Sequence, residues 1–205
     1  DADSTVHPDA LLRIAAVFAD PRIAAVTPGI HVSEPETLLQ HLQRAEYRLS
    51  IFIRYTFAKL GSVFITPGPF SIFRTTVIRE LGGWRQAHMT EDMEIGMRMQ
   101  EAGLAIVNEP NATVYTTTPR TIKKLFHQRV RWSYGFLRNT VDYKHMVGNP
   151  QYGNLGVIIL PAAIISIFSA VIFAGIAIWE IFGLLFHSII RIYNSGQISP
   201  WEGGF

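Results

Sequence analysis

The chain has 205 residues, a formal net charge of +2 and a mean hydropathy of +0.20, and 48% of its residues are hydrophobic. This composition excludes a disordered chain and favours contact with a membrane. The net charge is too small to indicate a nucleic-acid partner, and we expect none. The absence of cysteine excludes a disulfide scaffold, a thiolate zinc site and a cysteine nucleophile.

Helical and strand patterns alternate over the first 116 residues, which indicates an α/β domain. Thr90 is a good N-cap, two acids follow it in the first turn, and Gly103 fits the end of the same helix. The pattern predicts helices over 8–19, 36–60, 75–81 and 90–102, and strands over 23–27, 62–66, 70–74, 104–108 and 112–116.

Residues 155–179 contain no charged side chain. A helix of this length, at about 1.5 Å per residue, exceeds the ~30 Å hydrocarbon core of a bilayer, so we interpret it as a transmembrane helix rather than a buried soluble helix. A shorter apolar run follows Glu180 and meets Arg191. It predicts either an interfacial helix or a partial second transmembrane helix over 181–193.

Basic residues dominate the segment just before this apolar stretch, where Asp142 is the single acid. By the positive-inside rule this flank is cytoplasmic, which places the preceding domain in the cytoplasm. We therefore divide the chain into a catalytic domain, an interfacial helix with a linker, and the two apolar segments. The boundaries are 1–120, 121–150, 155–179 and 181–193; the basic residues are Arg120, Lys123, Lys124, Arg129, Arg131, Arg138 and Lys144.

Asp1 and Asp3 are two carboxylates one residue apart. At the end of a strand, such a pair can bind Mg²⁺ or Mn²⁺, which complete their coordination with water and a diphosphate. The alternative is a solvated acidic turn.

Thr90, Glu91 and Asp92 begin the predicted helix over 90–102. One interpretation is helix capping, in which the acids interact favourably with the helix dipole by roughly 0.3–1 kcal/mol. The other is catalytic: a carboxylate at the mouth of a cleft acts as general base on an acceptor hydroxyl.

Gln128, Arg131 and Trp132 share one side of a helix that begins near Thr121, because they are spaced at i, i+3 and i+4. The guanidinium suits phosphate oxygens, and the indole offers an apolar platform to a sugar ring. The alternative is an amphipathic juxtamembrane helix, with Leu125, Val130 and Trp132 toward lipid and Lys123, Lys124 and Arg129 at the headgroups. Both interpretations are compatible.

The order of these motifs resembles the membrane-integrated, processive family 2 glycosyltransferases, which include the cellulose, chitin, hyaluronan and poly-N-acetylglucosamine synthases. The resemblance covers residues 1 to about 180 and rests on the set of motifs in order. These are Asp-Ala-Asp at 1–3, Gly-Pro-Phe-Ser-Ile-Phe-Arg at 68–74, Thr-Glu-Asp at 90–92, Gln-Arg-Val-Arg-Trp at 128–132 and the apolar span.

The resemblance implies the C-terminal half of a GT-A domain, a doubly wound α/β sheet, followed by a transmembrane helix. Asp1 and Asp3 would hold Mg²⁺ or Mn²⁺ on the UDP diphosphate, with Asp3 the closer ligand. Asp92 would be the catalytic base. The substrate-binding residues would be Trp132 on the acceptor sugar, Arg131 on the diphosphate, Gln128 beside them, Glu91 next to the base and Gly68 near the acceptor end; Arg129 would have a structural or lipid-facing role.

The implied function is an inverting hexosyltransferase of the EC 2.4.1 type. It transfers glucose or N-acetylglucosamine from a UDP-sugar to a growing β-linked polysaccharide, coupled to membrane translocation. The resemblance implies a multi-pass protein of the cell membrane and leaves export subunits open. The first half of a GT-A domain is absent here, so we expect this fragment alone to be inactive. Two alternatives remain: a non-processive membrane glycosyltransferase with a lipid-linked acceptor, and a membrane-anchored, non-catalytic binding module.

Overall fold

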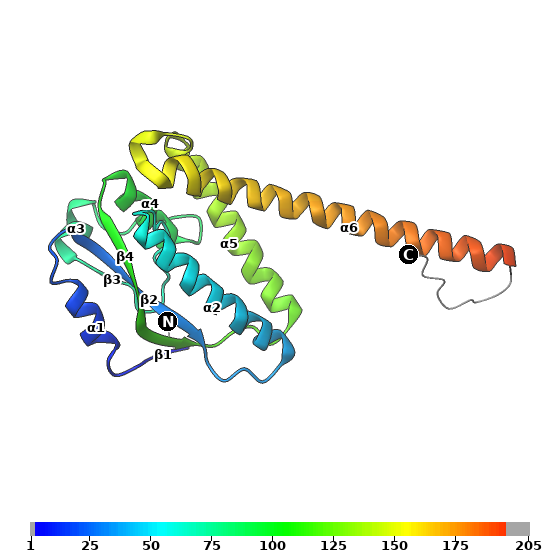
Figure 1. Cartoon of the computed structure of the whole chain (residues 1–205), viewed down its shortest axis with the longest axis horizontal. Coiled ribbons are helices and arrows are strands. Elements are labelled where there is room, and N and C mark those ends of the chain that lie inside the picture. Colours follow the sequence, from blue (N-terminus) through cyan, green and yellow to red (C-terminus); the bar gives the residue numbers. More distant parts are fainter. Residues whose placement is uncertain (1–2, 196–205) are drawn as a thin grey trace. The chain divides into compact units, whose positions relative to one another are not determined.

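A computed structural model describes residues 3–195. The chain divides into two compact units with the boundary after Pro161, and the first contains a four-stranded sheet in the order β1-β4-β2-β3 (Figure 1). The strands are β1 (Ser4–Val6), β2 (Ile23–Val32), β3 (Ile72–Phe73) and β4 (Ala105–Thr116). The helices of this unit are α1 (Ala10–Val17), α2 (Leu38–Lys59), α3 (Thr75–Glu80), α4 (Glu91–Glu101) and α5 (Ile122–Asp142).

The two central strands, β2 and β4, are parallel, whereas β1 and β3 are antiparallel to their neighbours. The sequence divided β4 into strands over 104–108 and 112–116, but one strand runs through both, with a register irregularity beside Pro110. Proline has no N–H to donate to the ladder, which explains the bulge. A Cβ on Gly29 of β2 would lie 2.2 Å from the Pro110 carbonyl oxygen, so only glycine fits there.

The predicted strand over 62–66 forms no regular secondary structure and joins no ladder of the described sheet. Its polar groups are used by the neighbouring helices instead. The Ser62 N–H donates to the Phe57 carbonyl at the end of α2, and the Thr66 N–H donates to the Asp92 carbonyl at the start of α4. Gln100 Nε2 donates to the Val63 carbonyl. This segment is therefore a bridge between α2 and α4, and the next predicted strand shortens to β3.

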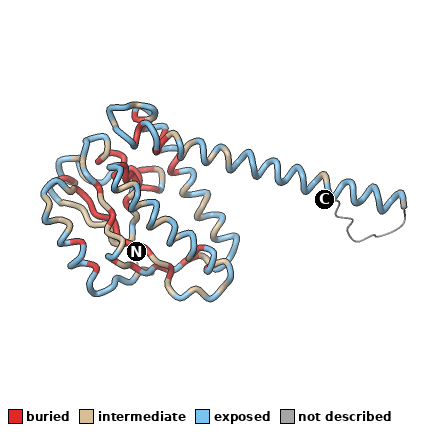
Figure 2. The backbone as a smooth tube through the Cα atoms, viewed as in Figure 1, coloured by how far each residue is buried: buried red, intermediate tan, exposed pale blue. Residues whose placement is uncertain are grey.

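Helices cover both faces of the sheet, and each face has its own apolar core. On one face α1 places Ala10 and Ile14 against Val26 of β2. On the other, Ile95 and Met99 of α4 pack with other apolar side chains. These are Ala24, Ala25, Val63, Val77 and Ile106, with Phe57 and Leu81 at the margin. The buried residues gather along the strands and α4 (Figure 2).

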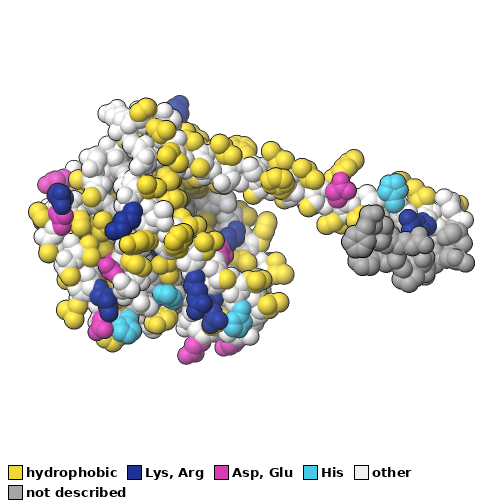
Figure 3. Space-filling model, viewed as in Figure 1, with side chains coloured by type: hydrophobic (Ala, Val, Ile, Leu, Met, Phe, Trp, Pro, Cys, Tyr) yellow, Lys and Arg dark blue, Asp and Glu magenta, His cyan; other side chains and the backbone are white. Residues whose placement is uncertain are grey.

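α2 has an inverted distribution of polar and apolar side chains. A polar stripe at spacings of three and four residues lies toward the interior, and consists of Gln40, Gln43, Tyr47, Ser50 and Arg54. The exposed side is apolar and contains Leu38, Leu42, Leu49, Phe52 and Ile53. Hydrophobic side chains interspersed with Lys and Arg cover the part of the surface where α2 lies (Figure 3).

α5 shares this inversion. Its exposed side carries Ile122, Phe126, Val130, Leu137 and Val141. Its buried residues include Gly135 and Asn139, which face the start of α4. Surface helices of soluble proteins normally expose polar residues, so both helices present apolar surface that an aqueous fold does not require.

Two short 3₁₀ turns, Lys144–Met146 and Pro150–Tyr152, and a π-helical turn, Leu155–Ile159, follow α5. They lead into α6 (Leu160–Ser195), which forms the second unit's described part. The sequence separated 155–179 from 181–193 at Glu180, but α6 continues through Glu180 without a break. Within the described residues, 155–194 is the one helical stretch long and apolar enough to cross a membrane, and its most apolar 18-residue window has a mean hydropathy of 2.7.

Candidate active site

Asp3 lies at the sheet edge where the parallel strands have their carboxyl ends. It directly precedes Ser4, which pairs with Thr116 at the end of β4, and Thr116 also pairs with Val32 at the end of β2. The Asp3 carboxylate is exposed and accepts a hydrogen bond from the Thr117 hydroxyl at 3.1 Å. Asp1, the other half of the predicted metal pair, lies outside the described residues.

This donor set fits a metal that arrives with a nucleotide better than a resident metal. Mg²⁺ usually takes one or two protein carboxylates and completes its octahedral coordination with water and substrate phosphates. The exposed Asp3 carboxylate supplies such a ligand. Among residues 3–195, no cluster of three or more His, Asp or Glu side chains could enclose an ion without a phosphate.

Asp92 occupies the first turn of α4, where the backbone is held by the bridge segment. Its carbonyl accepts hydrogen bonds from the Thr66 N–H at 3.1 Å and the Thr66 hydroxyl at 2.7 Å. Its carboxylate accepts the Met93 N–H at 2.9 Å. Because α4 runs antiparallel to the strand that follows it, its N-terminus lies toward the same carboxyl edge of the sheet as Asp3.

The pKa of Asp92 is raised, chiefly because burial removes water from its charged form. The neighbouring Glu91 raises it further, while the Met93 N–H and the positive charge of Arg131 on α5 lower it. A buried carboxylate with a raised pKa is suited to accept a proton near neutral pH. The neighbouring Glu91 is exposed whereas Asp92 is half-buried, because adjacent positions lie on different sides of α4.

α5 brings the third motif to this region. Arg131 is exposed, and its charge acts on Asp92. Gln128 is half-buried, and its Oε1 atom has no hydrogen-bond partner among the described residues. A buried carbonyl oxygen without a donor is costly unless a ligand satisfies it. Trp132 is half-buried, with the guanidinium of Arg129 4.4 Å from its ring centroid.

Arg129 has the structural role that the sequence left as one of two possibilities. It forms an ion pair of 2.6 Å with Glu46 on α2 while covering Trp132. The pair joins α2 to α5 and occupies one face of the indole.

The sequence analysis missed the polar stripe of α2. Arg54 is half-buried, its hydrogen bonds to the Pro28 carbonyl and Ser50 hydroxyl are long at 3.4 and 3.5 Å, and loss of water around the guanidinium lowers its pKa to about 10. Asp92 and Tyr47 attract its charge. Burial raises the pKa of Tyr47, which also responds to the charges of Arg129 and Asp3. The signal was present as polar residues at helical spacing between 40 and 54.

Comparisons with known proteins agree with this geometry. The family model described as Glycosyl transferase family group 2 matches residues 1–193. The chain belongs to the family 2 glycosyltransferases. It is 31% identical over 137 residues to the poly-β-1,6-N-acetyl-D-glucosamine synthase of Staphylococcus aureus strain COL, and 28% identical to the Staphylococcus epidermidis enzyme of that name. Each match covers 66% of this chain and 33% of the relative.

A solved structure shares the fold of this glycosyltransferase. The mannosyltransferase PcManGT from Pyrobaculum calidifontis, in complex with GDP-Man and Mn²⁺, superposes with a TM-score of 0.53 and 16% identity. The match covers 86% of this chain and 55% of that one. The predicted GT-A class is confirmed, and a nucleotide-sugar donor with a divalent metal is consistent with the family.

Gly68 belongs to a turn that starts just after the bridge to Asp92. The Ser71 hydroxyl donates to the Pro67 carbonyl at 2.6 Å and closes this turn, and Phe70 has a positive φ of 57°. Gly68 itself is exposed. This turn is therefore tied through Thr66 to the first turn of α4, which carries Asp92.

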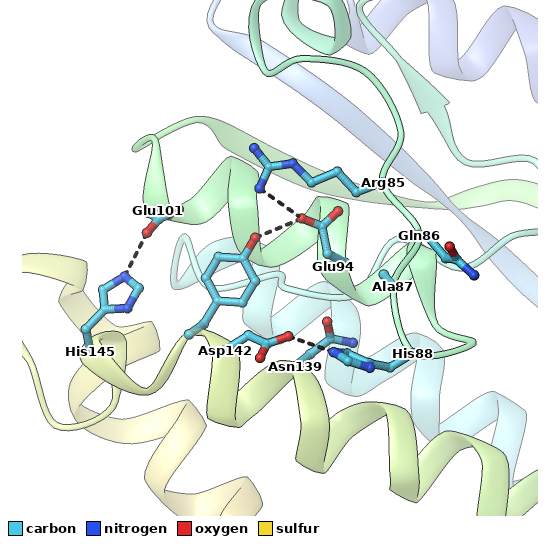
Figure 4. A pocket seen from close by; sticks show the side chains of 10 residues that line it. Arg85, Gln86, Ala87, His88, Glu94, Glu101, Asn139, Asp142 and His145 are labelled. Carbon is cyan, nitrogen blue, oxygen red and sulfur yellow. Dashed lines mark hydrogen bonds and ion pairs between the residues drawn. The ribbon is translucent and has the colours of Figure 1, made fainter.

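A cavity of about 390 Å³ lies between α4 and the end of α5, and no predicted site residue lines it (Figure 4). Its walls are ion pairs and hydrogen bonds rather than free ligands. His88 contacts Asp142 at 2.8 Å, His145 contacts Glu101 at 2.7 Å, and the Tyr143 hydroxyl donates to Glu94 at 2.9 Å. The cavity therefore belongs to the interface between α4 and α5 and not to the predicted substrate cleft.

Proposed function

We propose that this chain carries the catalytic base and acceptor site of an inverting, processive glycosyltransferase. The enzyme would transfer one sugar from a UDP-sugar to the end of a growing β-linked polysaccharide. Asp92 removes the proton from the attacking acceptor hydroxyl, and the α-linked donor becomes a β-linked product in one displacement.

The observation that carries this proposal is the environment of Asp92. Asp92 is half-buried at the start of α4, its pKa is raised mainly by removal of water from the charged form, and the cation of Arg131 acts on it from a different helix. A helix cap would need none of these features, because capping carboxylates are normally exposed and have lowered pKa values. Burial that raises the pKa suits a general base, and a nearby cation limits how far that pKa rises.

The other residues of α5 have distinct roles in the proposal. Arg131 faces the diphosphate and stabilises the charge that develops on UDP. Trp132 supports the acceptor sugar on the ring face that Arg129 leaves free. The unpartnered Gln128 Oε1 accepts a hydrogen bond from a sugar hydroxyl. Mg²⁺ or Mn²⁺ at Asp3, and at Asp1, would neutralise diphosphate charge.

The donor is proposed to be a UDP-sugar of the glucose or N-acetylglucosamine type, with the names of the Staphylococcus relatives favouring N-acetylglucosamine. This makes the protein a hexosyltransferase of the EC 2.4.1 type. Because the match covers 33% of these relatives, activity is to be measured on the full-length protein that contains these residues. We expect the 205 residues alone to be inactive.

Membrane attachment is part of the proposal. α6 is long and apolar enough to span a bilayer. The exposed apolar sides of α2 and α5 suit the interface, and the basic residues of α5 and its flanks support a catalytic unit on the cytoplasmic side of the cell membrane. The membrane then serves both as anchor and as the barrier that the product crosses.

The proposal is tested by supplying individual UDP-sugars and Mn²⁺ to the full-length protein in lipid nanodiscs. We expect metal-dependent release of UDP and long products by mass spectrometry, with one donor preferred. Addition of a single sugar would contradict processivity and favour the lipid-linked alternative. No UDP release with any donor would contradict the enzyme assignment and favour a binding module.

A further inference from the structure

Thr90 does not use its side chain as the helix cap that the sequence predicts. It precedes α4 with φ −140° and ψ 62°, and its hydroxyl makes no capping hydrogen bond. Instead, the hydroxyl oxygen accepts a hydrogen bond from Asn139 Nδ2 of α5 at 2.8 Å. The side chain is turned away from its own helix and is buried. The Thr90 side chain therefore connects α4 to α5 instead of capping α4.

Gly135 of α5 forms the seat for this side chain. A Cβ on Gly135 would lie 2.2 Å from the Thr90 hydroxyl oxygen and 2.3 Å from its methyl carbon, so only a hydrogen fits. Asn139, one turn further along α5, is fully buried and also donates to the Gly135 carbonyl at 3.0 Å. Thr90, Gly135 and Asn139 therefore form a close-packed contact, which we call the α4–α5 joint.

The joint lies within one helical turn of the proposed reactive groups on both helices. Asp92 follows Thr90 by two residues, while Arg131 and Trp132 precede Gly135 by four and three residues. On the opposite side, Thr66 fixes the Asp92 backbone with two hydrogen bonds. The position of the base is thus set by the bridge segment, and its separation from α5 is set by the joint.

Backbone strain just before the joint supports the same view. His88 and Met89 have positive φ values of 33° and 66°, which are costly for residues other than glycine. Such strain persists where surrounding contacts impose it, and it clusters at functional sites. Here this conformation of His88 and Met89 precedes Thr90, whose side chain packs against Gly135. His88 also contacts Asp142 on α5 (Figure 4).

We propose that Thr90, Gly135 and Asn139 are positioning residues that set the separation between Asp92 and the Arg131–Trp132 pair. This inference rests on the proposed function, because it assigns the joint a role only if Asp92 is the base. A displacement of about 1 Å in an active site can reduce the rate about 10²-fold, so a contact this close is sufficient to control turnover.

The test compares Thr90→Val, which keeps the shape and removes the hydroxyl, with Thr90→Ser, which keeps the hydroxyl, and with Gly135→Ala. All three are made in the full-length protein in nanodiscs. We expect Thr90→Val and Gly135→Ala to lower kcat by about 10- to 100-fold with the KM for UDP-sugar unchanged within twofold. Thr90→Ser is expected to keep kcat within threefold.

A second measurement separates positioning from general stability. Charged groups act on the Asp92 carboxylate from three helices: Glu91 on α4, Arg131 on α5 and Arg54 on α2. If α5 moves away, Arg131 lowers the pKa of Asp92 less. The acid limb of the pH profile of kcat/KM, which reports ionisation of Asp92, should therefore shift to higher pH in Thr90→Val and Gly135→Ala. It should not shift in Thr90→Ser.

Two control variants make the same kinds of substitution at positions outside the α4–α5 joint. Thr56→Val removes an exposed hydroxyl that bonds only the Phe52 carbonyl within α2, and Gly175→Ala adds a methyl group where no atom lies within 4 Å. Both are expected to retain wild-type kcat. The inference is overturned if Thr90→Val and Gly135→Ala also retain kcat, or if their losses merely follow a lower unfolding temperature with an unmoved acid limb.

The proposed function fails separately. If Asp92→Asn retains wild-type turnover, the base assignment is wrong whatever the joint variants do. If Asp92→Asn loses turnover and the joint variants do not, the base assignment stands and the positioning role is wrong.

Discussion

α1 and α2 pack against the same two strands, on opposite faces of the sheet, and they bury opposite kinds of side chain. α1 buries Ala10 and Ile14 in an apolar core. α2 buries Gln40 and Gln43 and turns its leucines outward. Burying polar groups costs free energy that apolar groups would not. The α1 face is therefore stabilised by apolar packing, whereas α2 buries polar side chains whose amides donate to the Thr118 and Pro119 carbonyls, and its outer side remains apolar.

The largest effect is expected from Trp132 of α5, the helix that Arg129 and Glu46 join to α2. Trp132→Ala should abolish chain elongation while the protein still folds, inserts and binds UDP, because only the acceptor loses its stacking surface. Arg129 remains held by Glu46 at 2.6 Å, so the link between α2 and α5 persists. Polymer yield and thermal stability in detergent are the measurements.

Trp132→Leu separates stacking from anchoring. If the indole were only an interfacial anchor, leucine would restore most of the lost stability and the polymer with it. We expect stability to return without polymer. Normal polymer from Trp132→Leu would contradict the acceptor platform and weaken the case for a processive enzyme.

Asp3 gives the next largest effect. Asp3→Ala should weaken Mn²⁺- or Mg²⁺-dependent UDP-sugar binding by at least ~10-fold, and more than Asp1→Ala, because the second Asp is the expected direct ligand. Asp9, an exposed acid beside α1, provides the matched control, and Asp9→Ala should leave binding unchanged. Equal and negligible changes in the metal titration for both Asp3 and Asp9 would remove the metal site from the account.

The contrast between the two faces predicts opposite outcomes for stability. Ile14→Ala on α1 should cost about 2–5 kcal/mol of unfolding free energy, because it empties a fully buried site. Arg54→Met on α2 should cost no stability, because burial already disfavours the guanidinium cation and lowers its pKa to about 10. Loss of activity is expected only for Arg54→Met, measured per folded molecule. A large loss of stability in Arg54→Met would show that the polar stripe serves the fold.

The smallest effects concern pH. Asp92 must be ionised to act as a base, so kcat/KM should fall as pH decreases through its raised pKa. Glu91 raises this pKa and Arg131 lowers it. Glu91→Gln should therefore shift the acid limb to lower pH, and Arg131→Gln should shift it to higher pH. If both variants shifted the acid limb of the pH profile in the same direction, that limb would report the ionisation of a group other than Asp92.

Local sequence signals predicted most of the helices within two residues, because caps and glycines mark where each begins and ends. The helix over 90–102 is an example: Gly103 has a φ of 71° and follows α4. The same local logic failed for the Thr90 side chain, whose partner Asn139 lies 49 residues away. It failed at 62–66 as well, where an apolar run looks like a strand until the competing partners on α2 and α4 are known.

The candidate site was predicted as motifs, and the structure adds the connections between them. Sequence alone could not distinguish Glu91 from Asp92 by environment, since burial depends on how α4 packs. Arg54 and Tyr47 were missed because their stripe lies on a helix that carries no recognised motif, although their helical spacing was visible. The order of the motifs indicated the family, which the family model confirms.

The most direct test of the account is the turnover of Asp92→Asn in the full-length protein, measured as polymer formed from the preferred UDP-sugar in nanodiscs. Asparagine keeps the size of the side chain and an acceptor oxygen for the Met93 N–H, but it cannot act as a base. The account predicts a loss of at least ~10²-fold in kcat with UDP-sugar affinity nearly unchanged. Turnover near that of the wild type would return Asp92 to a capping role and contradict the proposed mechanism.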